Sequence, residues 1–456
     1  MSLPQISVSQ RLAAAFARPL DLPEGMHALC DSLLVDIAGL CIAARKSDYV
    51  RAMLRASREA GNCTVIGMCD GTSAASAMLV NGTAAHGEDY DDTYEGGPIH
   101  AGAVIVPALL ATAERHLLSG FDLECGIAVG AELMCRLCTV APQRVHGAGF
   151  HPTAVFGALG AAAGVASALR LSADQWVNAL GIAGSMASGI IEYLAEGTWT
   201  KRMHPGWAAQ SGYRAARMAE EGFTGPRTLF EGEHGFFHAF AHADGPDFTQ
   251  MLEGAGSRWL AADMAFKPYA CGTMAHPYID CARNLVADGL RPEQVSAIEC
   301  RTAEGIVHRL WEPLSAKQNP PNGYAAKFSL PYAVAVAMLR GDAGLGEFEE
   351  TVVHDPAVRA LAGKVRYVID PANPYPQRFT GHVRATLRDG SVREASQDHF
   401  RGGRDAPMSV SELEQKFFAN CAHGGWSAAQ AKEALAVLRG LRSVSRIDLA
   451  RLRNSA

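Results

Sequence analysis

The sequence is short of charge, and the charge it has forms no long run of either sign. Only 19% of its 456 residues are Asp, Glu, Lys or Arg, with 41 basic against 47 acidic side chains and a formal charge of −6. Proteins that bind nucleic acid through their surface usually carry a basic patch or stripe, and the sequence contains none. The composition therefore favours a small molecule as the partner and indicates no nucleic acid.

The sequence also lacks an export signal and a clear membrane span. Residues 1–20 have neither a cationic stretch before a long apolar core nor a plausible cleavage site. The most apolar run, in residues 153–171, has about 17 residues, the lower edge of what a bilayer requires. Its Ala and Gly content is typical of a central helix whose neighbours approach closely. We therefore expect a cytoplasmic protein with no membrane contact.

The eleven cysteines form neither a disulfide framework nor a tight cluster. Their number is odd and no export signal precedes them, so we expect buried thiols. Cys135 and Cys138 form a C-x-x-C pair, but no βαβ pattern surrounds it and no second pair accompanies it. Iron–sulfur ligation requires thiolates in tight groups. The cysteines therefore argue against redox, zinc and iron–sulfur sites.

What is present is helical periodicity. Apolar residues recur every three or four positions through residues 7–265, and strand-like alternation appears only beyond 265. The predicted strands are 295–302 and 364–370, with a hairpin of 382–387 and 391–396 around an Asp-Gly turn. We predict a mainly α protein: a helical domain at 1–265, a smaller α+β domain at 266–402, and helices at 403–456 that return to the first domain.

Charge is concentrated in residues 84–102, where Glu88, Asp89, Asp91 and Asp92 lie between two histidines. On a helix, His86, Asp89 and Thr93 share one stripe. Carboxylates next to an apolar core must be paired, hydrogen-bonded or protonated, as in many functional sites. Two alternatives stay open: a solvated acidic helix end, and magnesium held against a diphosphate, for which a second acidic cluster is not obvious.

Three later segments supply cations. Residues 146–157 put His151 at a predicted helix start, where free backbone N–H groups favour an anion. Residues 197–212 place Lys201, Arg202 and His204 in a predicted loop before a helix. Residues 265–280 carry Lys267 and His276. Each side chain alone is more often structural, but together they provide the charge that a multiply charged carboxylate requires.

These segments resemble the MmgE/PrpD superfamily, which includes 2-methylcitrate dehydratases, cis-aconitate decarboxylases and iminodisuccinate epimerases. The matching motifs keep the family's order over residues 7–420, nearly the whole chain. They are residues 81–93 with His100, 149–164, 178–189, 197–212, 222–226, 266–272, 327–335 and 407–417.

The resemblance implies a helical domain built from both chain ends, an α+β lid domain with a cleft between them, a homodimer, and no metal or other cofactor. It also implies a set of site residues: Asp89, Thr93, His100, His151, Lys201, His204, Lys267 and Tyr332. The spacing from Thr93 to His100 is longer than in the decarboxylase-like members.

Family reactions remove or return a proton next to a carboxylate or imine, so the expected roles follow from charge. Lys201 and Lys267 stabilise the developing negative charge. His100 or His151 is the acid or base, because an imidazole titrates near neutral pH. Asp89 orients or charges a neighbour.

The remaining predicted site residues bind the substrate or act on its leaving group. Thr93 and His204 are expected to bind the substrate. Tyr332 either donates to the substrate's leaving hydroxyl or carboxylate, or is a core tyrosine.

With these parts we predict a lyase acting on a small di- or tricarboxylic acid, most simply a hydro-lyase for a 2-methylcitrate-like acid. Decarboxylation of a cis-aconitate-like acid and epimerisation of an iminodisuccinate-like acid use the same parts and stay open. A non-catalytic paralogue that binds an organic acid is the alternative from another class.

Overall fold

The computed structural model describes residues 6–18 and 20–454. Helices account for 56% of the chain and strands for 8%, so the predicted mainly α class is confirmed. The chain divides into two compact units. We call residues 6–18, 20–87, 91–265 and 410–454 the helical unit, and residues 88–90 and 266–409 the mixed unit. The predicted boundaries did not assign residues 88–90 to the second unit.

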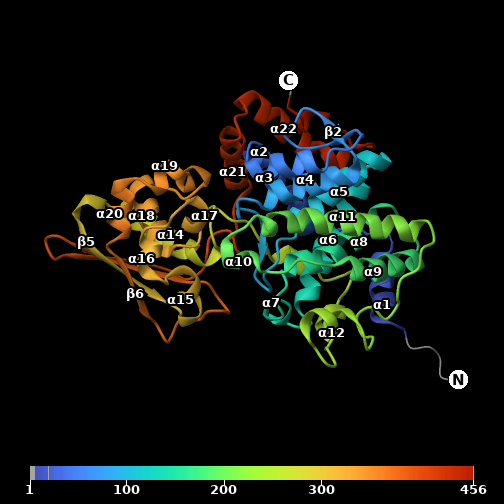
Figure 1. Cartoon of the computed structure of the whole chain (residues 1–456), viewed down its shortest axis with the longest axis horizontal. Helices are drawn as coiled ribbons and strands as arrows, with labels where there is room; N and C mark the ends of the chain where they lie inside the picture. The colour runs from blue at the N-terminus through green and yellow to red at the C-terminus, as the bar shows by residue number, and fades with distance from the viewer. Residues whose placement is uncertain (1–5, 19, 455–456) are drawn as a thin grey trace. The chain divides into compact units, whose positions relative to one another are not determined.

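The helical unit contains long helices joined by short connections (Figure 1). Its longer helices are α1 (Val8–Phe16), α2 (Glu24–Ala44), α3 (Asp48–Ala56), α4 (Ala74–His86), α5 (Gly102–His116), α6 (Gly120–Cys138), α8 (Pro152–Ala168), α9 (Ala173–Met186), α11 (Thr200–Glu220), α21 (Val410–His423) and α22 (Ala428–Gly440). Shorter elements are α7 (Arg144–Gly147), α10 (Tyr193–Glu196), α12 (Phe236–Ala241) and α13 (Thr249–Leu252), and the strand pairs β1 (Cys63–Thr64) with β2 (Gly71–Thr72) and β3 (Thr93–Tyr94) with β4 (Met264–Ala265).

Helix α8 is the centre of this unit. Every residue in it except Ser167 is buried, and it packs against α6, α9 and α11. A Cβ added at Gly164 would lie 2.6 Å from the carbonyl oxygen of Gly126 on α6, so only glycine permits this approach. The prediction of a core helix is confirmed. Helix α2 is long and apolar enough to cross a membrane, but 78% of that window is buried inside the protein, as in a core helix.

The C-terminal helices belong to the same unit. Helix α21 packs on α2, and Nζ of Lys416 lies 2.7 Å from Oδ1 of Asp36, with both side chains almost fully buried. A buried pair of this kind is costly to break on one side only. It therefore anchors the end of the chain to a helix near its beginning.

The mixed unit is a four-stranded sheet with helices packed on it. The strands are β5 (Val295–Thr302), β6 (Val365–Ile369), β7 (Gly381–Leu387) and β8 (Val392–Gln397), in the order β6-β5-β7-β8. Only the β5–β6 pair is parallel. The helices are α14 (His276–Ala287), α15 (Glu304–Leu310), α16 (Leu314–Gln318), α17 (Gly323–Ala326), α18 (Leu330–Arg340), α19 (Glu350–Val353) and α20 (Pro356–Ala362). The predicted strands and the hairpin are confirmed.

Two local predictions are wrong. Helix α4 ends at His86, and Asp89 has a left-handed backbone (φ 54°), so His86, Asp89 and Thr93 do not share a helical stripe. The predicted loop before the helix of residues 207–223 is also absent, because α11 already begins at Thr200. Pro205 removes one backbone hydrogen bond from α11. The helix continues through the proline, and the small residues that follow it, such as Gly206, Ala208 and Ala209, are buried in the core.

All eleven cysteines lie among the described residues and are free thiols. Ten are buried, including Cys135 and Cys138 inside α6, and Cys69 is exposed. The prediction of buried thiols is confirmed except at Cys69.

Candidate functional site

Four histidines from separate segments gather in the helical unit. His86 ends α4, His100 precedes α5, His151 precedes the first turn of α8, and His204 lies near the start of α11. The ring centroid of His86 lies 4.8 Å from that of His100 and 5.6 Å from that of His151. The ring centroids of His151 and His204 are 5.3 Å apart. We call these four side chains the histidine cluster. Three of them were predicted site residues, and His86 was not.

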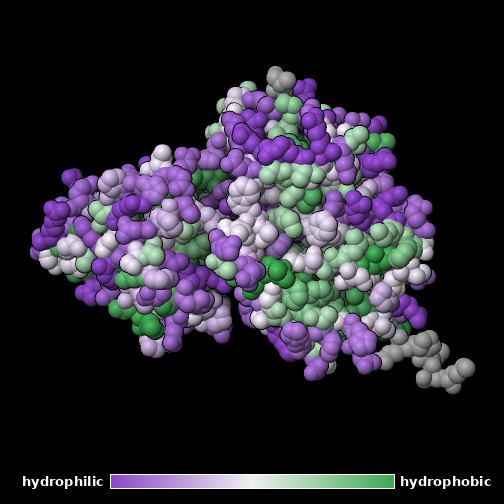
Figure 2. Space-filling view, in the orientation of Figure 1, coloured by the Kyte–Doolittle hydropathy of each residue, from purple (hydrophilic) through white to green (hydrophobic). Residues whose placement is uncertain are grey.

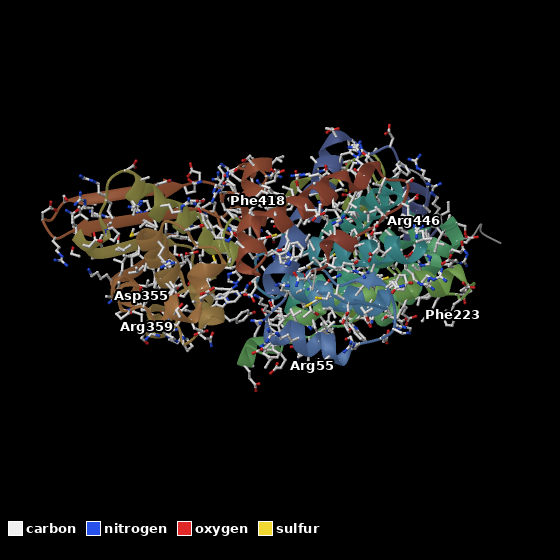
Figure 3. All side chains as sticks on the ribbon, turned by 90° about the horizontal axis from the view of Figure 1, so that it is seen from above. Arg55, Phe223, Asp355, Arg359, Phe418 and Arg446 are labelled. Carbon is white, nitrogen blue, oxygen red and sulfur yellow. The ribbon has the colours of Figure 1, made fainter. Side chains whose placement is uncertain are left out.

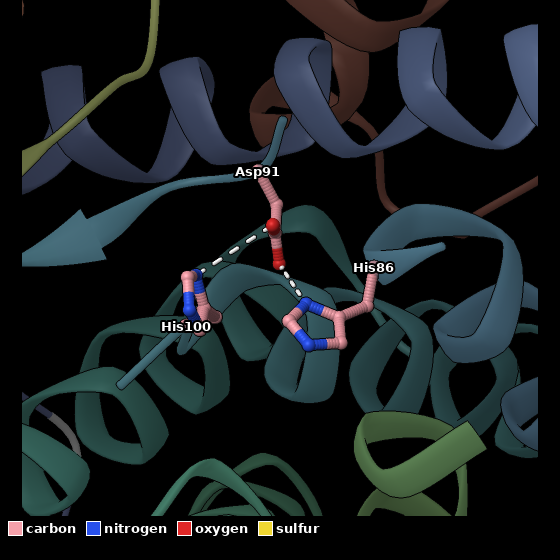
Figure 4. A group of neighbouring side chains, drawn as sticks. All are labelled: His86, Asp91 and His100. Atoms are coloured by element: carbon pink, nitrogen blue, oxygen red, sulfur yellow. Dashed lines mark hydrogen bonds and ion pairs between the residues drawn. The ribbon is translucent and has the colours of Figure 1, made fainter. Parts of the chain in front are cut away.

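Two aspartates orient one side of the histidine cluster, and Figure 4 shows the contacts of the first, Asp91, with His86 and His100. Nδ1 of His86 donates to Oδ2 of Asp91 at 2.7 Å, and Nδ1 of His100 lies 3.6 Å from the other oxygen of that carboxylate. Nδ1 of His100 also donates to the backbone carbonyl of Asp92 at 2.7 Å. Since a carbonyl only accepts, this bond places the proton on Nδ1. Nε2 is then the nitrogen of His100 that can gain or lose a proton while this bond is kept.

The other side of the cluster is a histidine pair. Nδ1 of His151 and Nδ1 of His204 are 3.1 Å apart, so one ring donates and the other accepts. Both rings are buried, and the ring of Tyr193 lies edge-on to each. The two imidazoles therefore hold opposite tautomers along one hydrogen bond.

Burial and neighbouring positive charge keep this pair neutral. Burial lowers the pKa of His151 well below its usual value, and positive charges on His86, Lys201, His204 and His100 add to the effect. Burial, then His86 and Lys201, lower the pKa of His204 to about 4. At neutral pH both rings are therefore uncharged, which is the state of a general base.

Two further predicted residues of the helical unit, Lys201 and Thr93, differ in their contacts. Lys201, in the first turn of α11, is half-buried and acts electrostatically on His151 and His204. Thr93 is half-buried in β3, where it pairs with Ala265. The structure brings His100, His151, His204 and Lys201 into one electrostatic group and shows no bond from Thr93 to it among the described residues.

Asp89 and Lys267 form a second group, inside the mixed unit. Nζ of Lys267 donates to Oδ1 of Asp89 at 2.8 Å and to its backbone carbonyl at 2.9 Å, and both side chains are buried. Lys327 binds Glu88 in the same way, at 2.8 Å to the carboxylate. The two lysines therefore bind the side chains and the backbone carbonyls of the two residues at this left-handed turn.

Tyr332 lies in α18 of the mixed unit and is fully buried. Its hydroxyl donates to the backbone carbonyl of Glu347, and burial raises its pKa. This is the geometry of a core tyrosine, one of the two roles predicted for it. Donation to a substrate stays a prediction.

Sequence reasoning missed His86 and Asp91 as partners. They lie five residues apart and meet because the helix stops at His86 and the chain turns back. Gly87, directly after His86, was the one signal of that helix end.

Part of the histidine cluster has the residue types of a metal centre. Ligand atoms of His86, Asp91 and His100 lie within 4.8 Å of one another. However, the Nδ1 atoms that face Asp91 are engaged in N–H···O bonds to Asp91 and to the Asp92 carbonyl. We therefore treat the group as a hydrogen-bonded network and assign no metal ligand in it.

Comparison with known proteins shows which family shares these features. Two family models match, the MmgE/PrpD N-terminal domain over residues 13–249 and the MmgE/PrpD C-terminal domain over residues 269–439. The chain is 32% identical over 363 residues to cis-aconitate decarboxylase of Homo sapiens, covering 75% of this chain and 72% of that protein. It is 26% identical over 432 residues to cis-aconitate decarboxylase of Aspergillus terreus, covering 87% and 85%. It is 27% identical over 146 residues to 2-methylcitrate dehydratase of Cupriavidus necator, covering 30% and 29%.

Proposed function

The chain belongs to the MmgE/PrpD family, and from that premise we propose that it is a cofactor-independent lyase acting on a small di- or tricarboxylic acid. The observation that carries the proposal is the buried His151–His204 pair, held neutral next to the cation of Lys201. A neutral imidazole exchanges protons with carbon, and a fixed cation stabilises the charge that builds on a carboxylate.

Each predicted residue then has a role. His151 is the base that removes a proton, and His100, through Nε2, is the acid that returns one. The backbone N–H of Thr153 at the start of α8 binds a substrate carboxylate, since Pro152 has no N–H and those of Ala154 and Val155 donate to the His151 carbonyl. His204 holds the tautomer of His151. In the mixed unit, Lys267 supplies a second cation that Asp89 orients. Thr93 and Tyr332 are proposed to donate hydrogen bonds to the substrate.

Decarboxylation of a cis-aconitate-like acid is the reaction we propose first. Relatives with that name match over 72% and 85% of their own length, against 29% for the dehydratase. In this reaction the bond between carbon and one carboxylate breaks and carbon dioxide leaves. The electron pair stays on carbon and takes a proton from Nε2 of the protonated His100. Because no proton is removed in this reaction, the neutral His151 binds the substrate by a hydrogen bond here and acts as a base only in the dehydratase and epimerase alternatives.

A hydro-lyase acting on a 2-methylcitrate-like acid is the second candidate, and the shorter match to a dehydratase favours it. There a base removes the α-proton and hydroxide leaves from the β-carbon with a proton from an acid. An epimerase and a non-catalytic acid-binding paralogue stay as alternatives that the relatives' names do not support.

The test is a proton-NMR assay in deuterated water with cis-aconitate, 2-methylcitrate, citrate and iminodisuccinate, using chelator-treated enzyme. Loss of a carboxylate identifies a decarboxylase, a new alkene with loss of water a dehydratase, and deuterium exchange alone an epimerase. His151→Gln should abolish the change. His27→Gln, which alters a His–Glu pair outside the histidine cluster, should retain it. Intact binding without turnover of any acid would favour the non-catalytic paralogue.

We also propose that the protein is a cytoplasmic homodimer with no nucleic-acid or membrane partner. An apolar stripe on the helical unit supports the dimer. It consists of six large side chains, each between 40% and 62% exposed: Ile190, Leu194, Trp199, Trp207, Met218 and Phe223. Figure 2 shows hydrophobic patches where Figure 1 places α9 to α11, and Figure 3 shows Phe223 at the periphery of the unit.

Three of the six side chains of the stripe lie on or next to α11: Trp199, Trp207 and Met218. Helix α11 has 21 residues, which corresponds to about 30 Å of length. A stable dimer buries about 800 Å² on each partner. A second copy of the chain, offering the same stripe, is the occupant we propose.

A further inference from the structure

The pair formed by Asp91 and His86 has no part in the lyase mechanism above. Both side chains are fully buried, and the bond between them is 2.7 Å long. Within residues 6–18 and 20–454, Nε2 of His86 is buried and has no hydrogen-bond partner. A buried ring with one nitrogen bound to a carboxylate and the other left unbonded requires an explanation.

The surroundings of His86 consist of titratable groups. Its ring is stacked on His151 at an interplanar angle of 28°, and His100 lies on another side. The titratable or charged groups around the cluster include Asp91, Asp92, His100, His151, Tyr193, Lys201 and His204, together with Tyr49, whose hydroxyl lies next to Gly87, and Arg202, which lies over the Tyr49 ring. Of these, only Asp91 is hydrogen-bonded to the His86 ring.

The contacts of His86 bring the pair against the base. The Asp91 carboxylate lies 2.7 Å from Nδ1 of His86, and the ring of His86 is stacked on the ring of His151. When His86 is protonated, its positive charge lies against the face of the His151 ring on which it is stacked.

We propose that Asp91 and His86 are positioning residues that control the protonation of the His151–His204 pair and so set the pH below which the enzyme loses its base. The role of His151 as base rests on the proposed function, but the control of its protonation does not. A cation stacked on one imidazole opposes the addition of a second proton there.

The direction of the pKa shifts agrees with this geometry. After burial, His86 is the largest cause that lowers the pKa of His151 and of His204. Lys201 ranks behind it in both cases. The effect of His86 on these two pKa values depends on Asp91, because the aspartate carboxylate stabilises the positive charge of a protonated His86.

The experiment is an NMR titration of the histidine imidazoles in the free protein, with no substrate present. In His86→Gln the positive charge is gone, so the midpoint of His151 should rise by about one pH unit. Asp91→Asn keeps the imidazole but removes the charge that stabilises its protonated form, so it should shift His151 in the same direction. His27→Gln, which disrupts a half-buried His–carboxylate pair outside the histidine cluster, should leave the midpoint unchanged.

The pH profile supplies a second readout. If one of the four acids is turned over, the acidic limb of kcat/KM should move to higher pH in His86→Gln and Asp91→Asn. A purely structural role would lower kcat without moving that limb. If no acid is turned over, the proposed function fails. The NMR titration then still shows whether Asp91 and His86 control the protonation of the His151–His204 pair.

Two results would overturn the proposal. One is an unchanged His151 midpoint in both variants, each shown by circular dichroism to be folded. The other is stoichiometric zinc binding by the wild type in calorimetry that is lost in His86→Gln, which would make the cluster a metal site.

Discussion

At the scale of single residues, the acidic segment is explained by the partner that each side chain finds. Five consecutive residues contact five different groups, through the pairs Glu88–Lys327, Asp89–Lys267, Tyr90–Pro268, Asp91–His86 and Asp92–Gly102. The segment therefore behaves neither as a solvated helix end nor as one cluster facing a metal. Burial without a partner would cost several kcal/mol for each carboxylate, about 3 to 5 for a broken pair.

The pair of Asp89 and Lys267 gives a first prediction. Lys267→Met leaves the Asp89 carboxylate buried without its cation, so the free energy of unfolding should fall by about 3 to 5 kcal/mol. Lyase activity should fall about 100-fold or more, since an electrostatic stabiliser is lost. Urea unfolding and the NMR assay measure the two effects.

The double variant Asp89→Asn/Lys267→Met separates them. It removes both charges, so most of the stability should return while the activity stays low. Recovery of activity together with stability would show that Lys267 is structural only.

His204 gives a prediction about pH and stability. Its pKa is about 4 in the folded protein, and an unfolded histidine titrates near 6.5, so between these values the unfolded chain binds more protons. Stability is therefore lost as pH falls from 6.5 to 4, by up to about 3 kcal/mol. The loss should be smaller in His204→Gln than in the wild type, since only the contribution of His151 then remains, and it should be unchanged in His308→Gln, whose histidine is exposed. Parallel stability curves for wild type and His204→Gln, measured by urea unfolding at pH 7 and pH 4.5, would contradict it.

At the scale of elements, the contact between α6 and α8 depends on glycine. Gly130 and Gly160 face each other across it as Gly126 and Gly164 do, and in both pairs an added Cβ would lie within 3.0 Å of a backbone oxygen. Backbone atoms cannot move aside as a flexible side chain does. Because α8 begins directly after His151, this contact also determines where that histidine lies.

Gly164→Val should therefore destabilise the protein by about 3 kcal/mol, because the two helices must separate to admit the side chain. The matched control is Gly440→Ala at the end of α22, where a Cβ meets nothing within 4 Å. That substitution should be neutral or stabilise by up to about 1 kcal/mol. Thermal unfolding measures both, and an equal effect at the two positions would refute the close-packing argument.

At the scale of the whole molecule, the apolar stripe predicts the oligomeric state. Trp207→Glu/Met218→Glu puts two carboxylates in the middle of the proposed dimer interface, where they would be desolvated without partners. Light scattering after size-exclusion chromatography should show a dimer for the wild type and a monomer for this variant. Phe121→Glu changes an exposed aromatic residue outside the stripe and should leave the dimer intact. A monomeric wild-type protein would end the proposal.

The sequence by itself determined the mainly α class, the strands and hairpin beyond residue 265, the core helix at 153–171 and the family, because periodicity, turn residues and motifs are local. It also located most of the candidate residues. It wrongly placed Asp89 and Thr93 on a helix, because the helix already ends at His86. It also placed Lys201 and His204 in a loop, although these residues belong to α11. Both errors fall next to a glycine or a proline, where local signals are ambiguous.

Only the tertiary structure decided which groups meet. Lys267 is 178 residues from Asp89 in the chain, and His204 is 53 residues from His151. Hydrogen bonds and charge effects depend on distances of a few ångströms, which spacing in the chain does not specify. The same holds for protonation: burial and the charges at His86 and Lys201 lower the pKa of His151, and both appear only when the helices are packed.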